Sequence, residues 1–254
     1  MIGNMSIIST IMNLNDGIDI KVNEAVGKCP GRNYTHEEFK NVPKSGTFFF
    51  CTIEEAKYLQ DMMLGTVAYS RSAFDVHEWL PMIGTNALNW HGSYYLHAGQ
   101  LSDREIGMFC RSDSGDKAWA GQMIKDTNDV DLVKDQVQRD EILFVAPRRE
   151  FSAEWRLWMI EGKCVASSRY VNPFAQYAEP DWPYKSDDEL RQAAIEFAEW
   201  LADQVYEPDD MYVVDVARAG SANLVVEYNA FSTSGWHDAD PERLIQAVER
   251  HFQS

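Results

Sequence analysis

The spacing of apolar and polar residues predicts a chain that is rich in short strands. An apolar run over residues 47–51 leads into a helical pattern, and Thr52 and Glu55 have the spacing of a capping box at the start of that helix. The pair Glu161-Gly162 predicts a tight hairpin turn. Further strands are expected over residues 106–111, 141–146, 154–160 and 163–171.

Two helices with clear boundaries are expected in the C-terminal half. Ser186 and Glu189 predict a second capping box, followed by an apolar stripe at helical spacing. The stripe consists of Leu190, Ala194, Phe197, Leu201 and Val205. Asp240 is expected to cap the last helix, with Pro241 at its first position. Residues 74–101 have no regular period, and the proline-rich segment 172–185 is expected to be a loop.

A hairpin predicted between these helices has polar residues where a buried strand is normally apolar. If Arg218 pairs with Leu224 across a five-residue loop, Asp215 lies opposite Glu227. Asn229 shares a sheet face with Glu227, because side chains alternate with a period of two. The predicted strands are 212–217 and 224–229.

The three polar groups of this hairpin have the chemistry of a magnesium site. Two carboxylates at cross-strand distance repel each other unless a cation lies between them. Oxygen ligands suit Mg²⁺, which takes the rest of its coordination shell from water and substrate phosphates. A solvent-facing strand with unconnected acids would have the same sequence pattern, so both interpretations stay open at this point.

Cationic residues near other strands add candidate phosphate contacts. Arg111 and Lys117 flank a Ser/Gly loop that follows a strand, although the P-loop spacing is absent. Arg156 lies within an apolar strand and therefore needs a partner, either Glu154 or Glu161 or a bound phosphate. Arg169 lies either beside it on the next strand or on the surface.

Composition narrows the functional classes. The 254 residues are 45% hydrophobic and have a formal net charge of −17, so we expect no general nucleic-acid binding and no membrane binding. The four cysteines include no CxxC pair, which argues against a zinc site and favours a reducing compartment. With no signal peptide and no 18-residue apolar span in view, a cytoplasmic protein is expected, in the host cytoplasm if it is phage-encoded.

Taken together and in this order, these segments resemble the ATP-grasp superfamily, and most of all its small members in bacteriophages and bacteria. The likeness covers about residues 45–250 and is carried by FFFCTIEEAKYL, FCRSDSGDKAWAG, ILFVAPRREFSAEWRLWMIEGKCVASSRYV and MYVVDVARAGSANLVVEYNAFSTSG. The resemblance implies an α+β ATP-grasp fold. Its expected parts are an N-terminal pre-grasp α/β lobe (1–100), a small ATP-grasp subdomain (101–145) and a C-terminal subdomain with the metal site (146–254).

The resemblance also implies roles for single residues. It implies that Asp215, Glu227 and Asn229 are Mg²⁺ ligands, and that Arg156 is a catalytic cation at the γ-phosphate, with Arg169 a weaker candidate for the same pocket. Arg111 is expected to face the phosphates, although many family members have Lys there. The remaining implied ATP-binding residues are Lys117 and Gly121 of the phosphate loop, and Leu143, Phe144, Val145 and Ala146 of the hinge at the adenine.

The activity that this resemblance implies is an ATP- and Mg²⁺-dependent ligase, which joins a carboxylate to an amine, or to a thiol, through an acyl phosphate. The expected substrates are small-molecule or peptide carboxylates and amines, and the FSTSG segment after Asn229 is a candidate acceptor site. Three alternatives remain: a phosphotransferase with a hydroxyl acceptor, a nucleotide-binding interaction protein without catalysis, and a structural protein whose acids are surface charges. The oligomeric state is left open.

Overall fold

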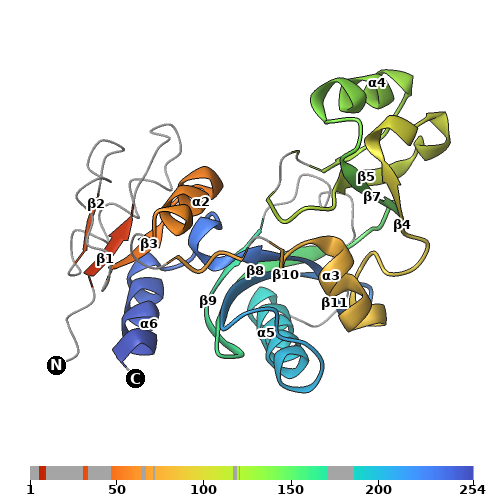
Figure 1. Cartoon of the computed structure of the whole chain (residues 1–254). Coiled ribbons are helices and arrows are strands. Elements are labelled where there is room, and N and C mark those ends of the chain that lie inside the picture. The colour runs from red at the N-terminus through yellow and green to blue at the C-terminus, as the bar shows by residue number, and fades with distance from the viewer. Residues whose placement is uncertain are drawn as a thin grey trace.

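The chain is built on three β-sheets that lie side by side (Figure 1). The first is a small parallel sheet, and the other two are four-stranded and antiparallel, so the predicted α+β class is confirmed. The computed structural model describes residues 6–9, 31–33, 47–63, 67–70, 72–116, 119, 121–170 and 186–253. The predicted loop over 172–185 lies outside this described part of the chain.

The first sheet consists of β1 (Ser6–Ser9), β2 (Gly31–Asn33) and β3 (Thr47–Phe50), in the order β2-β1-β3. Thr52 follows β3 and caps α2 (Ile53–Asp61). The predicted capping box is confirmed, because the Thr52 hydroxyl accepts from the Glu55 amide at 3.3 Å and the Glu55 carboxylate accepts from the Thr52 amide at 2.8 Å.

The second sheet has the order β4-β7-β5-β6. Its strands are β4 (Tyr94–His97), β7 (Ile142–Pro147), β5 (Met108–Ser112) and β6 (Gln122–Met123). Residues of this sheet pack with α4 (Thr127–Gln136) in one hydrophobic cluster. Because β4 pairs with β7, the sheet already begins before residue 101, where the sequence suggested the start of the small subdomain.

The third sheet has the order β11-β10-β8-β9 and is the largest. Its strands are β8 (Ala153–Ile160), β9 (Lys163–Arg169), β10 (Met211–Ala219) and β11 (Ala222–Ala230). On one face it packs in a single cluster with α3 (Val76–Ile83) and α5 (Asp187–Gln204). On part of the other face it packs with β3 and α6 (Pro241–Gln253), which join it to the first sheet (Figure 1).

Local signals in the sequence placed most element boundaries correctly. Ser186 and Glu189 form the expected capping box of α5, and Asp240 accepts hydrogen bonds from the amides at the start of α6. The Glu161-Gly162 turn is confirmed, and both of its residues have positive φ, at 49° and 69°. Such a turn matches the twist of the two strands that it joins.

The hairpin of β10 and β11 is longer than predicted, and its turn is shorter. Arg218 pairs with Asn223 instead of Leu224, and only two residues separate the strands. A β-bulge between Asp215 and Val216 then shifts the register by one residue, so Asp215 still pairs with Glu227. The predicted juxtaposition is therefore confirmed, although the pairing from which it was derived was wrong.

Three elements have weak sequence signals and were not predicted. α3 contains Pro81, which normally interrupts a helix, and its Asp75 N-cap makes no capping hydrogen bond. β4 is an edge strand with mostly exposed side chains, so it lacks an apolar alternation. α4 is largely polar and buries only Val130 and Val133.

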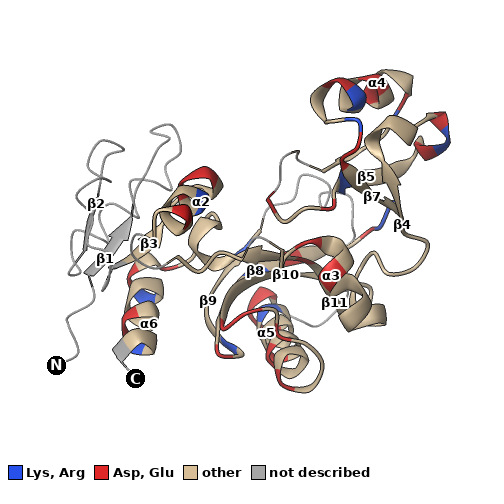
Figure 2. Cartoon of the chain, in the orientation of Figure 1, with Lys and Arg blue, Asp and Glu red and all other residues tan. Residues whose placement is uncertain are grey.

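The negative charge is spread over the surface helices. Acidic residues occur on α2, α4 and α5 (Figure 2). A distributed charge of this kind is typical of a solvated surface. Among the described helices, none combines the length and the apolar character needed to cross a bilayer.

Replacement of Thr52 tests the junction between the first sheet and α2. Thr52→Ala should lower the free energy of unfolding by about 1 kcal/mol, because the Glu55 amide loses its acceptor. Thermal denaturation should show a decrease of about 2–4 °C in Tm. Thr52→Ser retains the acceptor and should be close to wild type; an equal loss in both variants would contradict the capping role.

Candidate functional site

A row of polar residues crosses one face of the third sheet. Ser168 on β9, Arg156 on β8, Asp215 on β10 and Glu227 on β11 are successive register partners, so their side chains share a face. Apolar residues lie on both sides of the row along the strands. They are Trp158 and Val213 on one side, and Leu88, Phe151 and Ala217 on the other.

Arg156 and Asp215 form the centre of this row. Arg156 Nε lies 2.8 Å from Asp215 Oδ1 and Nη2 lies 2.7 Å from Oδ2, which is a bidentate ion pair. The side chains are only 6% and 1% exposed. Burial works to lower the pKa of Arg156, but the charge and hydrogen bonds of Asp215, with Glu227, outweigh it and raise the pKa, so the guanidinium stays charged.

Glu227 connects the third sheet to the second. Its Oε2 accepts from Nη1 of Arg111, on β5, at 2.7 Å, and its Oε1 lies 3.7 Å from Nη2 of Arg156. Asn229 Nδ2 donates to Glu227 Oε1 at 3.0 Å and to Asp215 Oδ2 at 3.2 Å. Two carboxylates are thus matched by two guanidinium groups, and one amide bridges the carboxylates.

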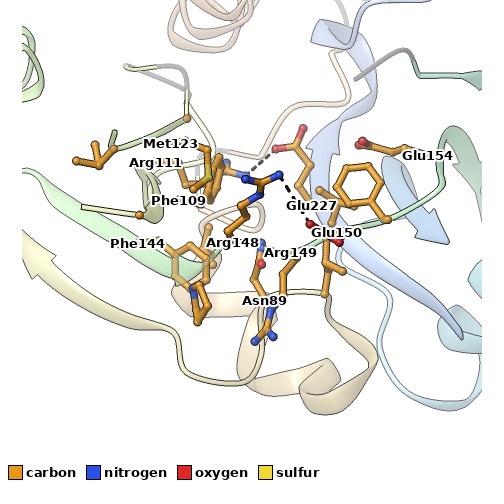
Figure 3. A pocket seen from close by; sticks show the side chains of 18 of the residues that line it. Asn89, Phe109, Arg111, Met123, Phe144, Arg148, Arg149, Glu150, Glu154 and Glu227 are labelled. Carbon is orange, nitrogen blue, oxygen red and sulfur yellow. Dashed lines mark hydrogen bonds and ion pairs between the residues drawn. The ribbon is translucent and has the colours of Figure 1, made fainter. Parts of the chain in front are cut away.

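A cleft of about 1110 Å³ opens beside this row, between the second and third sheets (Figure 3). Arg111 and Glu227 face each other across it. Its apolar lining includes Phe109, Met123, Phe144 and Phe151, and its polar lining includes Asn89, Arg148, Arg149, Glu150 and Glu154. An apolar cleft with a few charged groups at one end is the usual form of a small-ligand site.

Arg156 has two further neighbours on the side that faces away from Glu227. Its guanidinium carbon lies 4.7 Å from the centre of the Tyr170 ring, and its Nη1 lies 3.3 Å from His237 Nε2. His237 has a φ of 48°, which is uncommon for a residue other than glycine. Sequence patterns gave no signal for either contact, because Tyr170 ends a strand and His237 is one of six histidines.

Not every residue expected at the site lies there. Arg169 is paired with Trp155, on the opposite face from Arg156, and forms an ion pair with Asp187 at the start of α5. The structure therefore does not bring Arg169 to the pocket that the sequence suggested. Lys117 lies outside the described residues.

The predicted hinge residues are divided between the cleft and a core. Phe144 lines the cleft, whereas Leu143 and Val145 are buried in the cluster under the second sheet. All of these residues lie within β7, which is paired with β4 and β5. Ala146 precedes Pro147, and residues 147–151 after it line the cleft as the segment that joins the two sheets.

Gly121 lies where the polypeptide passes close to β5. A Cβ added there would be 2.6 Å from Phe109 Cζ and 2.9 Å from Arg111 Cβ. Only glycine therefore fits beside the Arg111 side chain without a shift of its neighbours. Gly121 also lines the cleft, as expected of a residue near a bound phosphate chain.

The donor set of the row fits a magnesium ion bound together with phosphates. Asn229 Oδ1 is buried and has no hydrogen-bond partner among the described residues, although its amide nitrogen has two. A buried acceptor without a partner is costly unless a ligand satisfies it. The same part of the chain contains no group of three or more His, Cys, Asp or Glu side chains that could hold a metal. Two carboxylates and one amide oxygen suffice for Mg²⁺ when a substrate supplies other oxygens.

Comparison with known proteins gives a consistent family. A family model described as an ATP-grasp domain, clade family 3, matches residues 42–248. No curated protein sequence matches the chain.

Several solved structures have a similar fold at low sequence identity. A D-alanine–D-alanine ligase from Bacillus anthracis has a TM-score of 0.58 at 11% identity, covering 98% of this chain and 97% of that one. A RimK domain protein ATP-grasp from Sphaerobacter thermophilus DSM 20745 has 0.58 at 12%, with 98% and 100% covered. The ATP-grasp ligase PsnB, complexed with minimal precursor, Mg and ADP, has 0.51 at 12%, with 98% of each chain covered. At these identities the likeness shows the fold.

Removal of Asp215 should destabilise the protein strongly. Asp215→Ala leaves Arg156 buried with its main partner gone, which should cost about 3–5 kcal/mol of unfolding free energy. The double variant Arg156→Met/Asp215→Leu removes both charges and should be more stable than Asp215→Ala. Urea denaturation measures all of these; a double variant that is less stable than the single one would contradict the pairing argument.

Proposed function

The chain belongs to the ATP-grasp superfamily, and from this membership we propose that it is an ATP- and Mg²⁺-dependent ligase that joins a carboxylate to an amine. The observation that supports the proposal most is the charge-matched row of Asp215, Arg156 and Glu227, which ends at Arg111 across the cleft. The ligase structures with the same fold, one of them complexed with Mg and ADP, support the reaction class and the cofactors.

In this proposal the nucleotide lies along the cleft. The adenine packs near Phe144, and its edge meets the backbone of residues 147–151, where the strand pairing of β7 ends. This assignment moves the hinge a few residues beyond Leu143–Ala146, whose backbone lies within the sheet. The phosphates extend towards Arg111 and Gly121, so they reach the charged end of the cleft.

The proposed ligands of the metal are Glu227, Asn229 and Asp215, which hold it against the phosphate oxygens. Without nucleotide, the carboxylates are neutralised by Arg111 and Arg156. When a triphosphate binds, its oxygens compete for these guanidinium groups, and the carboxylate oxygens become available to a cation. Bound Mg²⁺ would supply charge neutralisation for the phosphoryl oxygens. The exchange keeps the buried charge balanced in both states, which burial in low dielectric demands.

The proposed reaction has two steps. An oxygen of the substrate carboxylate attacks the γ-phosphorus, the bond to the β-γ bridging oxygen breaks, and ADP leaves with that electron pair. The amine then attacks the acyl carbon, inorganic phosphate leaves, and the amine loses a proton to a base or to water. The role proposed for Arg156 and Arg111 is to stabilise the charge that spreads over the transferred oxygens. No covalent bond to the protein is required.

A phosphotransferase with a hydroxyl acceptor would use the same residues, so the product decides between the two. Carboxylates, free and in peptides, are screened for ADP release with hydroxylamine as the amine. A ligase should give a hydroxamate in amounts equal to ADP, because hydroxylamine captures the acyl phosphate. ADP release that yields a phosphorylated alcohol, with no hydroxamate from any carboxylate, would contradict the proposal.

Glu227→Gln tests the proposed metal ligand. Wild-type protein with Mg²⁺ and ATP at about 100 times Kd should gain about 2.7 kcal/mol, seen as a Tm increase of a few degrees. In Glu227→Gln the Mg²⁺-dependent part of this increase and the ADP release should be lost. The control Glu196→Gln changes an exposed carboxylate of α5 and should behave as wild type. Full turnover in Glu227→Gln would exclude Glu227 as a ligand.

A further inference from the structure

The segment that follows β5 is fastened to residues that lie earlier in the chain. The Asp113 carboxylate accepts from the His77 backbone amide at 2.9 Å and forms an ion pair with His77 Nδ1. The Asp113 carbonyl accepts from the Val76 amide at 2.9 Å. His77 and Val76 begin α3, which packs on the third sheet. These contacts therefore join a loop of the second sheet to a helix on the third.

Two more contacts fasten the same segment at Gly115 and Asp116. The Gly115 amide donates to Asp75 Oδ1 at 2.7 Å. A Cβ on Gly115 would lie 2.8 Å from Phe74 Cβ and 3.0 Å from the Phe74 carbonyl carbon, so only glycine permits this close approach. Asp116 forms an ion pair with Lys57 Nζ at 2.5 Å and accepts a hydrogen bond from the Tyr69 hydroxyl.

These contacts determine the charge of a segment that lies next to the proposed phosphate site. Asp113 and Asp116 are two and five residues beyond Arg111, and unpaired carboxylates there would repel a triphosphate. His77 and Lys57 supply the matching positive charges. Asp113 is 5% exposed in its side chain, so its charge is directed into the protein and away from solvent.

The contacts also connect the two walls of the cleft. Arg111 on the second sheet reaches Glu227 on the third, and the segment that follows Arg111 reaches α3 and α2. With both connections present, the position of Arg111 relative to the third sheet is fixed from two directions.

We propose that His77, Asp75 and Lys57 are positioning residues for ATP: they hold Ser112–Asp116 so that Arg111 and the segment after it meet the nucleotide phosphates. None of the three lines the cleft, so they act through the loop. This inference rests on the proposed function, because it assigns the residues a role in nucleotide binding.

The ion pair of His77 with Asp113 gives the proposal a pH signature. Burial works to lower the pKa of His77, but the hydrogen bond and charge of Asp113, then Glu78 and Asp75, raise it above its usual value. A raised pKa means that the charged pair is complete at low pH and is lost as pH rises through the folded-state pKa. The contribution of His77 to nucleotide affinity should follow the same direction.

The test measures the Kd of MgATP by calorimetry on the full chain. His77→Ala should raise Kd about tenfold, because the loop then spends less time in the binding arrangement. His77→Asn offers a donor to Asp113 and should restore most of the affinity at neutral pH, without the loss on raising pH that wild type shows. The control His91→Ala removes an exposed imidazole that is not tied to the loop and should leave Kd unchanged.

The outcomes separate this inference from the proposed function. If wild type binds no MgATP, the proposed function fails and the positioning role fails with it. If wild type binds MgATP and His77→Ala binds it equally well at all pH values, only the positioning role is overturned. Lys57→Met, at a half-exposed position, is a second variant if His77→Ala does not fold; an unchanged Kd in both Lys57→Met and His77→Asn, with wild-type pH dependence, would also overturn it.

Discussion

The arrangement of the site follows from one constraint: Asp215 and Glu227 are neighbours on the face of a sheet, and buried carboxylates need matching positive charge. The Arg156 guanidinium supplies it for Asp215 in a bidentate pair, and Arg111 supplies it for Glu227 from another sheet. Taking such charges out of water costs several kcal/mol for each ion, in round terms, and only good geometry offsets that cost. The strand order β11-β10-β8-β9 provides the geometry, because it places the acids and Arg156 on adjacent strands.

Since Arg111 belongs to the second sheet, the same constraint also brings the two sheets together. The Glu227 carboxylate is matched only when the walls of the cleft are close enough for a 2.7 Å contact. A nucleotide that takes over Arg111 would release this contact and replace it with contacts of its own. Closure of the cleft and phosphate binding are therefore coupled through one side chain, and an Arg suits this role because its planar group can meet carboxylate or phosphate in the same way.

The sequence was most informative where a local pattern determines structure. Capping boxes at Thr52 and Ser186 and the Glu161-Gly162 turn depend on residues that are close in the chain, and all three are present. α3 and β4 are held by tertiary contacts, so propensity and periodicity gave no indication of them. The face on which Arg169 lies follows from strand register, and its partner Asp187 belongs to a helix that the sequence could not place relative to β9.

The pairing of Asp215 with Glu227 shows why a correct site can come from an incorrect register. The prediction placed a five-residue loop in the hairpin, and the structure has a two-residue turn and a bulge instead. A bulge adds one residue to one strand, and it lies between the turn and the acids, so it cancels the error at the turn before the strands reach Asp215. Side-chain alternation then requires that either all three polar residues converge or the buried face carries an unmatched acid. The requirement for charge balance fixes the register at the site more strongly than the turn does.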